Sequence, residues 1–135
     1  MSRHKTSAHE VATLLDLIQR DLSDCRVDSI GTDWAFNIAY NAALQAATLA
    51  LHVSGFRASR EGGHERTIES LRYTINADPD LIRLLQDFRK KRNKAEYEMS
   101  GVVSELEREE MLRTAEDLFI QIQKWLKEHH PDLVK

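Results

Sequence analysis

Residues 34–56 read WAFNIAYNAALQAATLALHVSGF, and this stretch decides the fold class because it contains no lysine, arginine, aspartate or glutamate. Alanine and leucine dominate it, which is typical of a helix buried on several sides. Polar side chains interrupt it at helical spacing and fall within one narrow sector: Asn37, Asn41, Gln45, Thr48 and His52. A bilayer core disfavours amides and an imidazole, so we expect the central helix of a soluble bundle without a membrane partner.

Helical patterns flank the central stretch on both sides. Before it, Ser7 and Glu10 have the spacing of a capping box, and apolar residues follow every three or four positions: Val11, Leu14, Leu15, Ile18 and Leu22. Thr32 or Asp33 is expected to cap the central helix, which should run to about residue 55. After it, a loop is predicted over residues 57–63 and a helix over 64–76.

The second half of the chain contains two further helix starts. Asp78 and Pro79 supply a cap and a proline at the first helical position, and the helix that they begin should end near residues 99–101. Ser104 and Glu107 form a second capping-box pattern, and the last helix should stop before Pro131.

Together these patterns predict one all-α domain. The chain has 135 residues, with only five glycines and two prolines, and it shows no sustained period-two alternation. We predict a single domain over residues 1–135, with an ordered core of about 7–129. The expected architecture is an up-and-down bundle of four main helices, whose third helix is broken near Asp78-Pro79.

Composition narrows the function. The net charge is −3, so nucleic-acid binding would have to be local, because no global positive field exists. The single cysteine, Cys25, excludes an internal disulfide and a zinc site of cysteines, and it suits a reducing cytoplasm. There is no phosphate-binding glycine loop, His-Glu-x-x-His motif or nucleophile elbow. We therefore expect a cytoplasmic protein with no metal site and no cofactor.

The segment LLQDFRKKRNKAEY, residues 84–97, contains the clearest candidate site. Wound as a helix, it gathers one apolar stripe: Leu81, Leu84, Leu85, Phe88, Ala95 and Met99. Arg92 falls in the middle of that stripe. An unpaired buried charge costs several kcal/mol, so Arg92 must pair, reach an edge or face a second molecule.

Asn93 and Tyr97 follow Arg92 and can both donate and accept hydrogen bonds. They are four residues apart and share a helix face, whereas Arg92 and Tyr97 point about 140° apart on a straight helix. A kink at Asn93 could bring them together, as could a twofold axis between two copies, and the second option favours a homodimer with a shared cleft.

Other basic and histidine residues surround this segment. Arg83, Lys90 and Lys94 share the outward sector and are typical of a solvated face. His64 follows two glycines at a predicted helix start, where backbone N–H groups favour anions. We predict a substrate-binding set of His64, Lys94, Arg89 and His52. The structural alternatives are a salt bridge from Arg92 to Glu69 or to the last helix, and surface or groove positions for the histidines.

The stretch Arg92-Asn93-Lys94-Ala95-Glu96-Tyr97 resembles the motif of the HEPN family (higher eukaryotes and prokaryotes nucleotide-binding). Residues 51–57 and 63–71 also resemble a bacterial and actinobacterial subgroup of small stand-alone HEPN proteins, and the resemblance covers about residues 33–126. It implies a dimeric helical bundle that acts as a metal-independent ribonuclease toxin, often neutralised by a nucleotidyltransferase-type antitoxin.

The resemblance also implies roles for the motif residues. Arg92 would stabilise the phosphate of an RNA substrate, Asn93 would orient it, and a histidine would transfer protons. This chain has Tyr97 where that histidine is expected, and a phenol with a pKa of about 10 is a poor base at neutral pH. Arg92, Asn93 and Tyr97 are thus the candidate catalytic set. The alternatives are a non-catalytic module that binds a nucleotide, RNA or protein, and a purely structural dimerisation unit.

Overall fold

The structure, a computed structural model, describes residues 1–27, 30–97 and 103–134, with residues 94–97 described as backbone only. The described part is mostly helical, as predicted, and contains five α-helices that pack against each other. The elements in chain order are β1 (Ser2–Arg3), α1 (Ala8–Asp24), α2 (Thr32–Val53), β2 (Phe56–Arg57), α3 (Gly63–Thr74), α4 (Pro79–Tyr97), α5 (Glu105–His129) and the 3₁₀ helix η1 (Pro131–Leu133).

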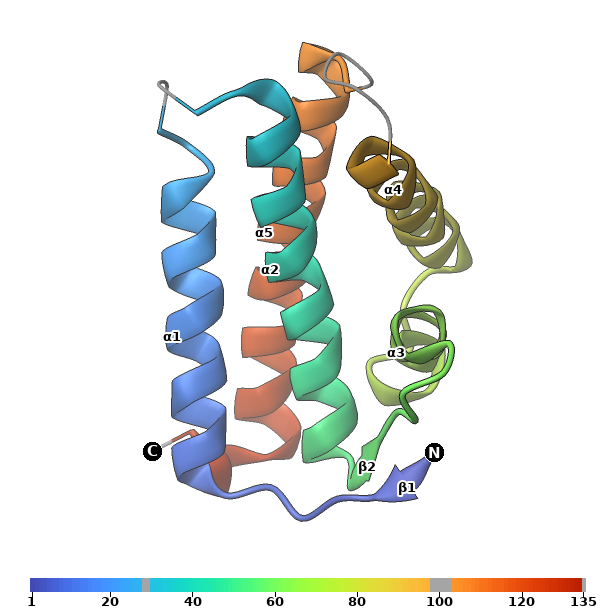
Figure 1. Cartoon of the computed structure of the whole chain (residues 1–135). Helices are drawn as coiled ribbons and strands as arrows, with labels where there is room; N and C mark the ends of the chain where they lie inside the picture. The colour runs from blue at the N-terminus through green and yellow to red at the C-terminus, as the bar shows by residue number, and fades with distance from the viewer. Residues whose placement is uncertain (28–29, 98–102, 135) are drawn as a thin grey trace.

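Helix α2 is the central element, as its uncharged sequence predicts. It lies beside α1 and α5, while α3 and α4 pack against its other side (Figure 1). Twelve of its 22 residues are buried, and seven of these are alanines, whose small side chains let the neighbouring helices approach closely. None of the described helices, α2 included, has the length and apolarity needed to cross a membrane.

The core takes side chains from all five helices. Among the large residues with almost no exposed surface are Ile18 of α1, Phe36 and Tyr40 of α2, Ile68 and Leu71 of α3, Leu85 of α4, and Met111, Leu118, Ile122 and Leu126 of α5. The rings of Phe36 and Phe88 meet edge to face, with their centroids 5.7 Å apart. This contact places the middle of α4 directly against α2.

The predicted break near Asp78-Pro79 separates two distinct helices, α3 and α4. The left-handed backbone of Asn76, with φ of 53°, turns the chain after α3. The Asp78 carboxylate then accepts a hydrogen bond from the backbone N–H of Asp80 at 2.8 Å, so it caps α4 as expected. The predicted end of this helix near residues 99–101 lies outside the described residues.

The helix caps agree with the predictions only in part. The Ser104–Glu107 box is complete, and Ser7 accepts from the backbone N–H of Glu10, but the Glu10 carboxylate points to two histidines instead of back to Ser7. The predicted cap of α2 was wrong, because Gly31 occupies that position without a side-chain bond. Thr32 instead donates to Glu105, which holds the start of α2 beside the start of α5.

The N-terminal segment is part of the fold, which the predicted core of residues 7–129 left out. Residues 2–3 pair antiparallel with residues 56–57, in strands too short to produce an alternating pattern. The segment crosses the end of α2 (Figure 1), where the His4 N–H donates to the Gly55 carbonyl at 2.8 Å. The Thr6 hydroxyl donates to the His52 carbonyl at 2.7 Å.

Candidate functional site

Arg92 lies on the side of α4 that faces α2. Phe88 and Leu85, one and two turns earlier, are buried on the same side, and Arg92 is half-buried. Its guanidinium carbon lies 5.5 Å from the centroid of the Tyr40 ring, which is the geometry of a cation–π contact. The guanidinium of Arg92, which falls in the apolar stripe of α4, therefore contacts the face of an aromatic ring of α2.

Tyr40 joins Arg92 to His64. The ring of Tyr40 is 1% exposed, and the His64 ring lies 6.5 Å from it, centroid to centroid, tilted by 52°. His64 is exposed at the start of α3. A guanidinium of α4 and an imidazole of α3 thus both lie near one buried phenol of α2. Tyr40 is not among the predicted site residues, because its only signal in the sequence is a phenol within an alanine-rich helix.

Gln86 holds α4 against the first turns of α3. Its amide nitrogen donates to the Glu65 carbonyl at 2.9 Å and to the Glu69 carboxylate at 3.3 Å. Its amide oxygen accepts from Arg89 Nε at 2.8 Å. The amide therefore positions Arg89 on the α3 side of α4, close to the helix start that carries His64. That start has Gly62 as its N-cap, with φ of 65° and no side-chain hydrogen bond.

The basic residues of α4 divide among different neighbours. Lys91 faces α5 and pairs with Glu107 at 3.1 Å, whereas Lys90 is exposed. Glu69, a partner considered for Arg92, contacts Arg72 and Gln86. Among the described side chains of α4, the basic residues thus do not form one continuous patch.

Not all the predicted site residues come together. Asn93 is exposed next to Arg92, and the side chains of Lys94 and Tyr97 lie outside the described part. His52 is not at this site, because it lies twelve residues after Tyr40, about 18 Å farther along α2. It contacts Glu10 of α1 instead.

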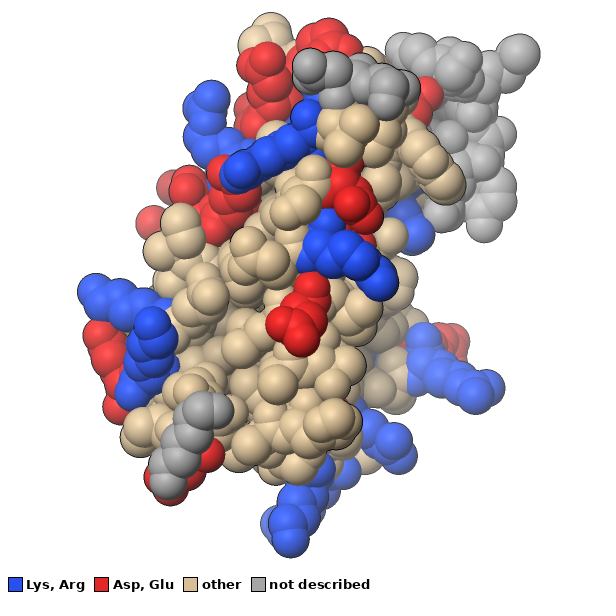
Figure 2. All heavy atoms as spheres, turned by 90° about the vertical axis from the view of Figure 1, so that its left-hand side faces the viewer, with Lys and Arg blue, Asp and Glu red and all other residues tan. Residues whose placement is uncertain are grey.

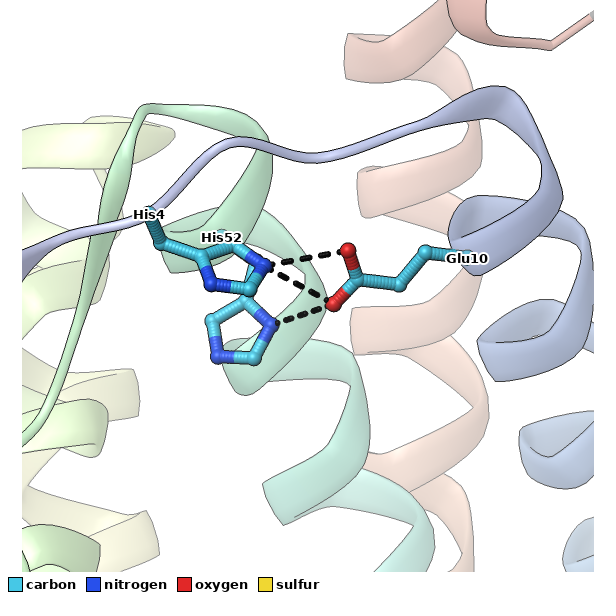
Figure 3. A group of neighbouring side chains, drawn as sticks. All are labelled: His4, Glu10 and His52. Carbon is cyan, nitrogen blue, oxygen red and sulfur yellow. Dashed lines mark hydrogen bonds and ion pairs between the residues drawn. The ribbon is translucent and has the colours of Figure 1, made fainter.

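A second polar cluster lies at the C-terminal end of α2 and contains His4, Glu10 and His52 (Figure 3). His4 Nε2 lies 3.0 Å from both carboxylate oxygens of Glu10, and His52 Nδ1 lies 3.0 Å from Oε1. The two imidazole rings are 4.1 Å apart. Burial acts to raise the pKa of Glu10, but the hydrogen bonds and charges of His4 and His52 outweigh it and hold that pKa below its ordinary value.

No local pattern predicts this cluster. Glu10 fits a helix cap, His52 belongs to the predicted substrate-binding set, and nothing in the sequence around His4 indicates a role for it. The polar stripe of α2 did carry a signal, because Gln45 and His52 both belong to it and both contact carboxylates of α1, Asp21 and Glu10.

On the α1 side of the molecule, lysine and arginine side chains are interspersed with aspartate and glutamate, so the described residues of this face form no large patch of a single charge sign (Figure 2). A scan of protein-family models and a search among curated proteins each find no match for this chain. The functional inference thus depends on the chemistry of the residues themselves.

Proposed function

We propose that the protein is a HEPN-type, RNA-directed protein that binds an RNA phosphodiester at Arg92 and His64 and cleaves it without a metal. One observation carries this proposal: Arg92 of α4 and His64 of α3 both lie near the same buried ring, Tyr40. Guanidinium groups suit phosphate oxygens in charge and geometry, and an imidazole titrates near neutral pH. These are the two kinds of group that such a cleavage requires.

The surroundings of Arg92 suit an anion. The cation–π contact with Tyr40 orients the guanidinium of Arg92. The uncapped first turn of α3 adds backbone N–H groups and the positive end of a helix dipole beside His64. Arg89, positioned by Gln86, adds a second cation, and the exposed Asn93 supplies an amide to orient the substrate.

In the proposed reaction His64 accepts the proton of a ribose 2′-hydroxyl. The 2′-oxygen attacks phosphorus, the bond from phosphorus to the 5′-oxygen breaks, and the imidazolium returns a proton to that oxygen. The products are a 2′,3′-cyclic phosphate and a 5′-hydroxyl. Arg92 stabilises the negative charge that develops on the non-bridging oxygens. His64 thereby takes the role that the family resemblance gives to a histidine at the position of Tyr97.

The proposal extends to architecture and partners. Helices α3 and α4 together would be the broken third helix of an up-and-down, four-helix HEPN bundle. The protein would act as a homodimer in the cytoplasm, with a cleft between the two α4 helices, and a nucleotidyltransferase-type antitoxin would be its natural inhibitor. Light scattering of the purified protein tests the dimer directly.

A non-catalytic RNA- or nucleotide-binding module is the second candidate. The observation that favours it is Tyr97, since a phenol replaces the residue that the resemblance assigns to proton transfer. In that case Arg92 would still bind phosphate, but no bond would break. A Tyr97→His variant that gains cleavage would support this candidate.

The test incubates the protein with end-labelled tRNA and mRNA in EDTA. We expect fragments ending in a 2′,3′-cyclic phosphate, and no fragments from His64→Ala. Arg92→Met should weaken RNA binding and lower the slope of log K against log salt by about 1. Arg83→Met is the matched control, because this exposed arginine pairs with Asp80 at the other end of α4.

The results distinguish between the two candidate functions. Binding without cleavage, with Arg92→Met impaired, selects the non-catalytic module. Unaltered RNA binding by a folded Arg92→Met protein, or no binding by the wild type, overturns the proposal.

A further inference from the structure

We propose that His4, Glu10 and His52 form a binding site for a divalent transition metal of the zinc class. The three ligand atoms, one from each residue, all lie within 4.8 Å of one another. The site lies at the C-terminal end of α2, about 18 Å along the helix from Tyr40. It therefore does not depend on the proposed action on RNA.

The distances fit a metal without a rearrangement of the backbone. Zinc bonds of about 2.0–2.2 Å in a tetrahedral site place neighbouring ligand atoms roughly 3.3–3.6 Å apart. His4 Nε2 and His52 Nδ1 each lie 3.0 Å from the same oxygen of Glu10. Small rotations of these side chains would open both separations and admit an ion where the three groups converge (Figure 3).

The chemistry of the donors selects the class of ion. Two imidazoles and one carboxylate suit zinc, cobalt or nickel, whereas magnesium and calcium prefer oxygen ligands alone. Three protein ligands leave a fourth position for water. The side chains of His4, Glu10 and His52 are 22%, 29% and 20% exposed, so they are partly shielded but accessible to an ion from solvent.

The protein holds the three ligands in place from three different elements. His4 belongs to the N-terminal segment, Glu10 to the first turn of α1, and His52 to the last turn of α2. Hydrogen bonds outside the cluster anchor each of them: the backbone N–H of His4 donates to Gly55, Thr6 donates to the His52 carbonyl, and Ser7 accepts from the Glu10 N–H. Such preorganisation lowers the cost of metal binding.

A bound ion would connect the N-terminal segment to the bundle. The short β1–β2 pairing and the hydrogen bonds of His4 and Thr6 hold this segment on the end of α2. A metal bonded to His4, Glu10 and His52 at once would add a much stronger link between segment, α1 and α2. Metal binding to the folded state raises stability by mass action, so the melting temperature should rise with metal concentration.

The experiment titrates the full chain with Zn²⁺ by calorimetry and with Co²⁺ by visible absorption. We expect one ion per chain, a Kd below about 10 μM for Zn²⁺, intense Co²⁺ bands from a four-coordinate site, and no comparable binding of Mg²⁺. His4→Ala, Glu10→Gln and His52→Ala should each weaken Zn²⁺ binding at least tenfold. His9→Ala is the matched control, because this exposed histidine adjoins Glu10 in α1 and lies outside the cluster.

His4→Ala is the decisive variant, because it changes the segment before α1 and leaves every helix intact. Circular dichroism checks that it folds. Zn²⁺ binding that survives in folded His4→Ala and Glu10→Gln proteins, or is lost only in His9→Ala, overturns the proposal. Absence of binding by the wild type also overturns it and leaves the cluster as a hydrogen-bonded group without a metal.

Discussion

The guanidinium of Arg92 rests on the face of Tyr40, with 5.5 Å between its central carbon and the ring centroid. The contact joins α4 to α2, the most buried helix of the bundle, at a tyrosine that is 1% exposed. It gives a charged side chain a favourable neighbour on a face that otherwise carries Leu85 and Phe88. The same arginine is the phosphate ligand of the proposed function, so its structural and functional contributions must be measured separately.

A double-mutant cycle of Arg92→Met and Tyr40→Leu measures the structural contribution. Methionine keeps the length of the side chain and removes its charge, and leucine removes the aromatic face. We expect a coupling free energy of about 0.5–2 kcal/mol in urea unfolding, which is the range of cation–π contacts. A coupling near zero would mean that the contact does not stabilise the fold. Arg83→Met, far from Tyr40 on α4, should show no coupling.

The alanine-rich surface of α2 should not tolerate larger side chains. Ala46 is fully buried in the core, and Ala46→Leu should destabilise the protein by about 1–3 kcal/mol, because the added atoms must displace a packed neighbour. Ala12 is exposed on α1, so Ala12→Leu should change the free energy of unfolding by less than about 0.5 kcal/mol. Equal effects at the two positions would contradict the close packing around α2.

Glu107 should make stability depend on acidic pH. The backbone N–H of Ser104 donates a hydrogen bond to the Glu107 carboxylate. This bond, together with Lys91, outweighs the effect of burial and holds the pKa of Glu107 below its ordinary value. A depressed pKa in the folded state stabilises the protein above the unfolded value of about 4.3, and this contribution is lost as pH falls through the folded pKa.

Glu107→Gln tests this dependence, because glutamine can still complete a capping box without a charge. The variant should be less stable than the wild type at pH 7, and in thermal unfolding the difference should shrink as the pH falls below the unfolded value of about 4.3. Ser104→Ala should cost about 1 kcal/mol across that range, because it removes the cap itself. Glu109→Gln, exposed on the same helix, controls for the loss of one negative charge. A difference that does not shrink as the pH falls would contradict the assignment.

Cys25 should be inert in the native protein. It is 1% exposed, its thiol donates to the Leu22 carbonyl at 3.3 Å, and burial raises the pKa of the thiol despite the neighbouring Arg26. Since the thiolate is the reactive form, we expect alkylation at pH 8 to be at least about 100-fold slower than in urea-unfolded protein. Similar rates in the two states would show that the end of α1 opens readily.

Local patterns predicted much of the fold. The spacing of apolar residues indicated the helices and the central place of α2, and serine, aspartate and proline marked several helix starts. These signals depend on neighbours three or four residues apart, so a single sequence contains them. The predicted cap of α2 failed because Thr32 bonds to Glu105, a residue that is distant in sequence.

By itself, the sequence determined that the chain forms packed helices and that Arg92 turns toward the apolar side of its own helix. Only the tertiary structure decided that Arg92 and His64 both lie near the ring of Tyr40, and that His52 meets Glu10 across 42 residues of chain. Periodicity sets which side of a helix a residue occupies. The residue that it faces depends on the register and crossing of whole helices, which the close packing of the entire core determines.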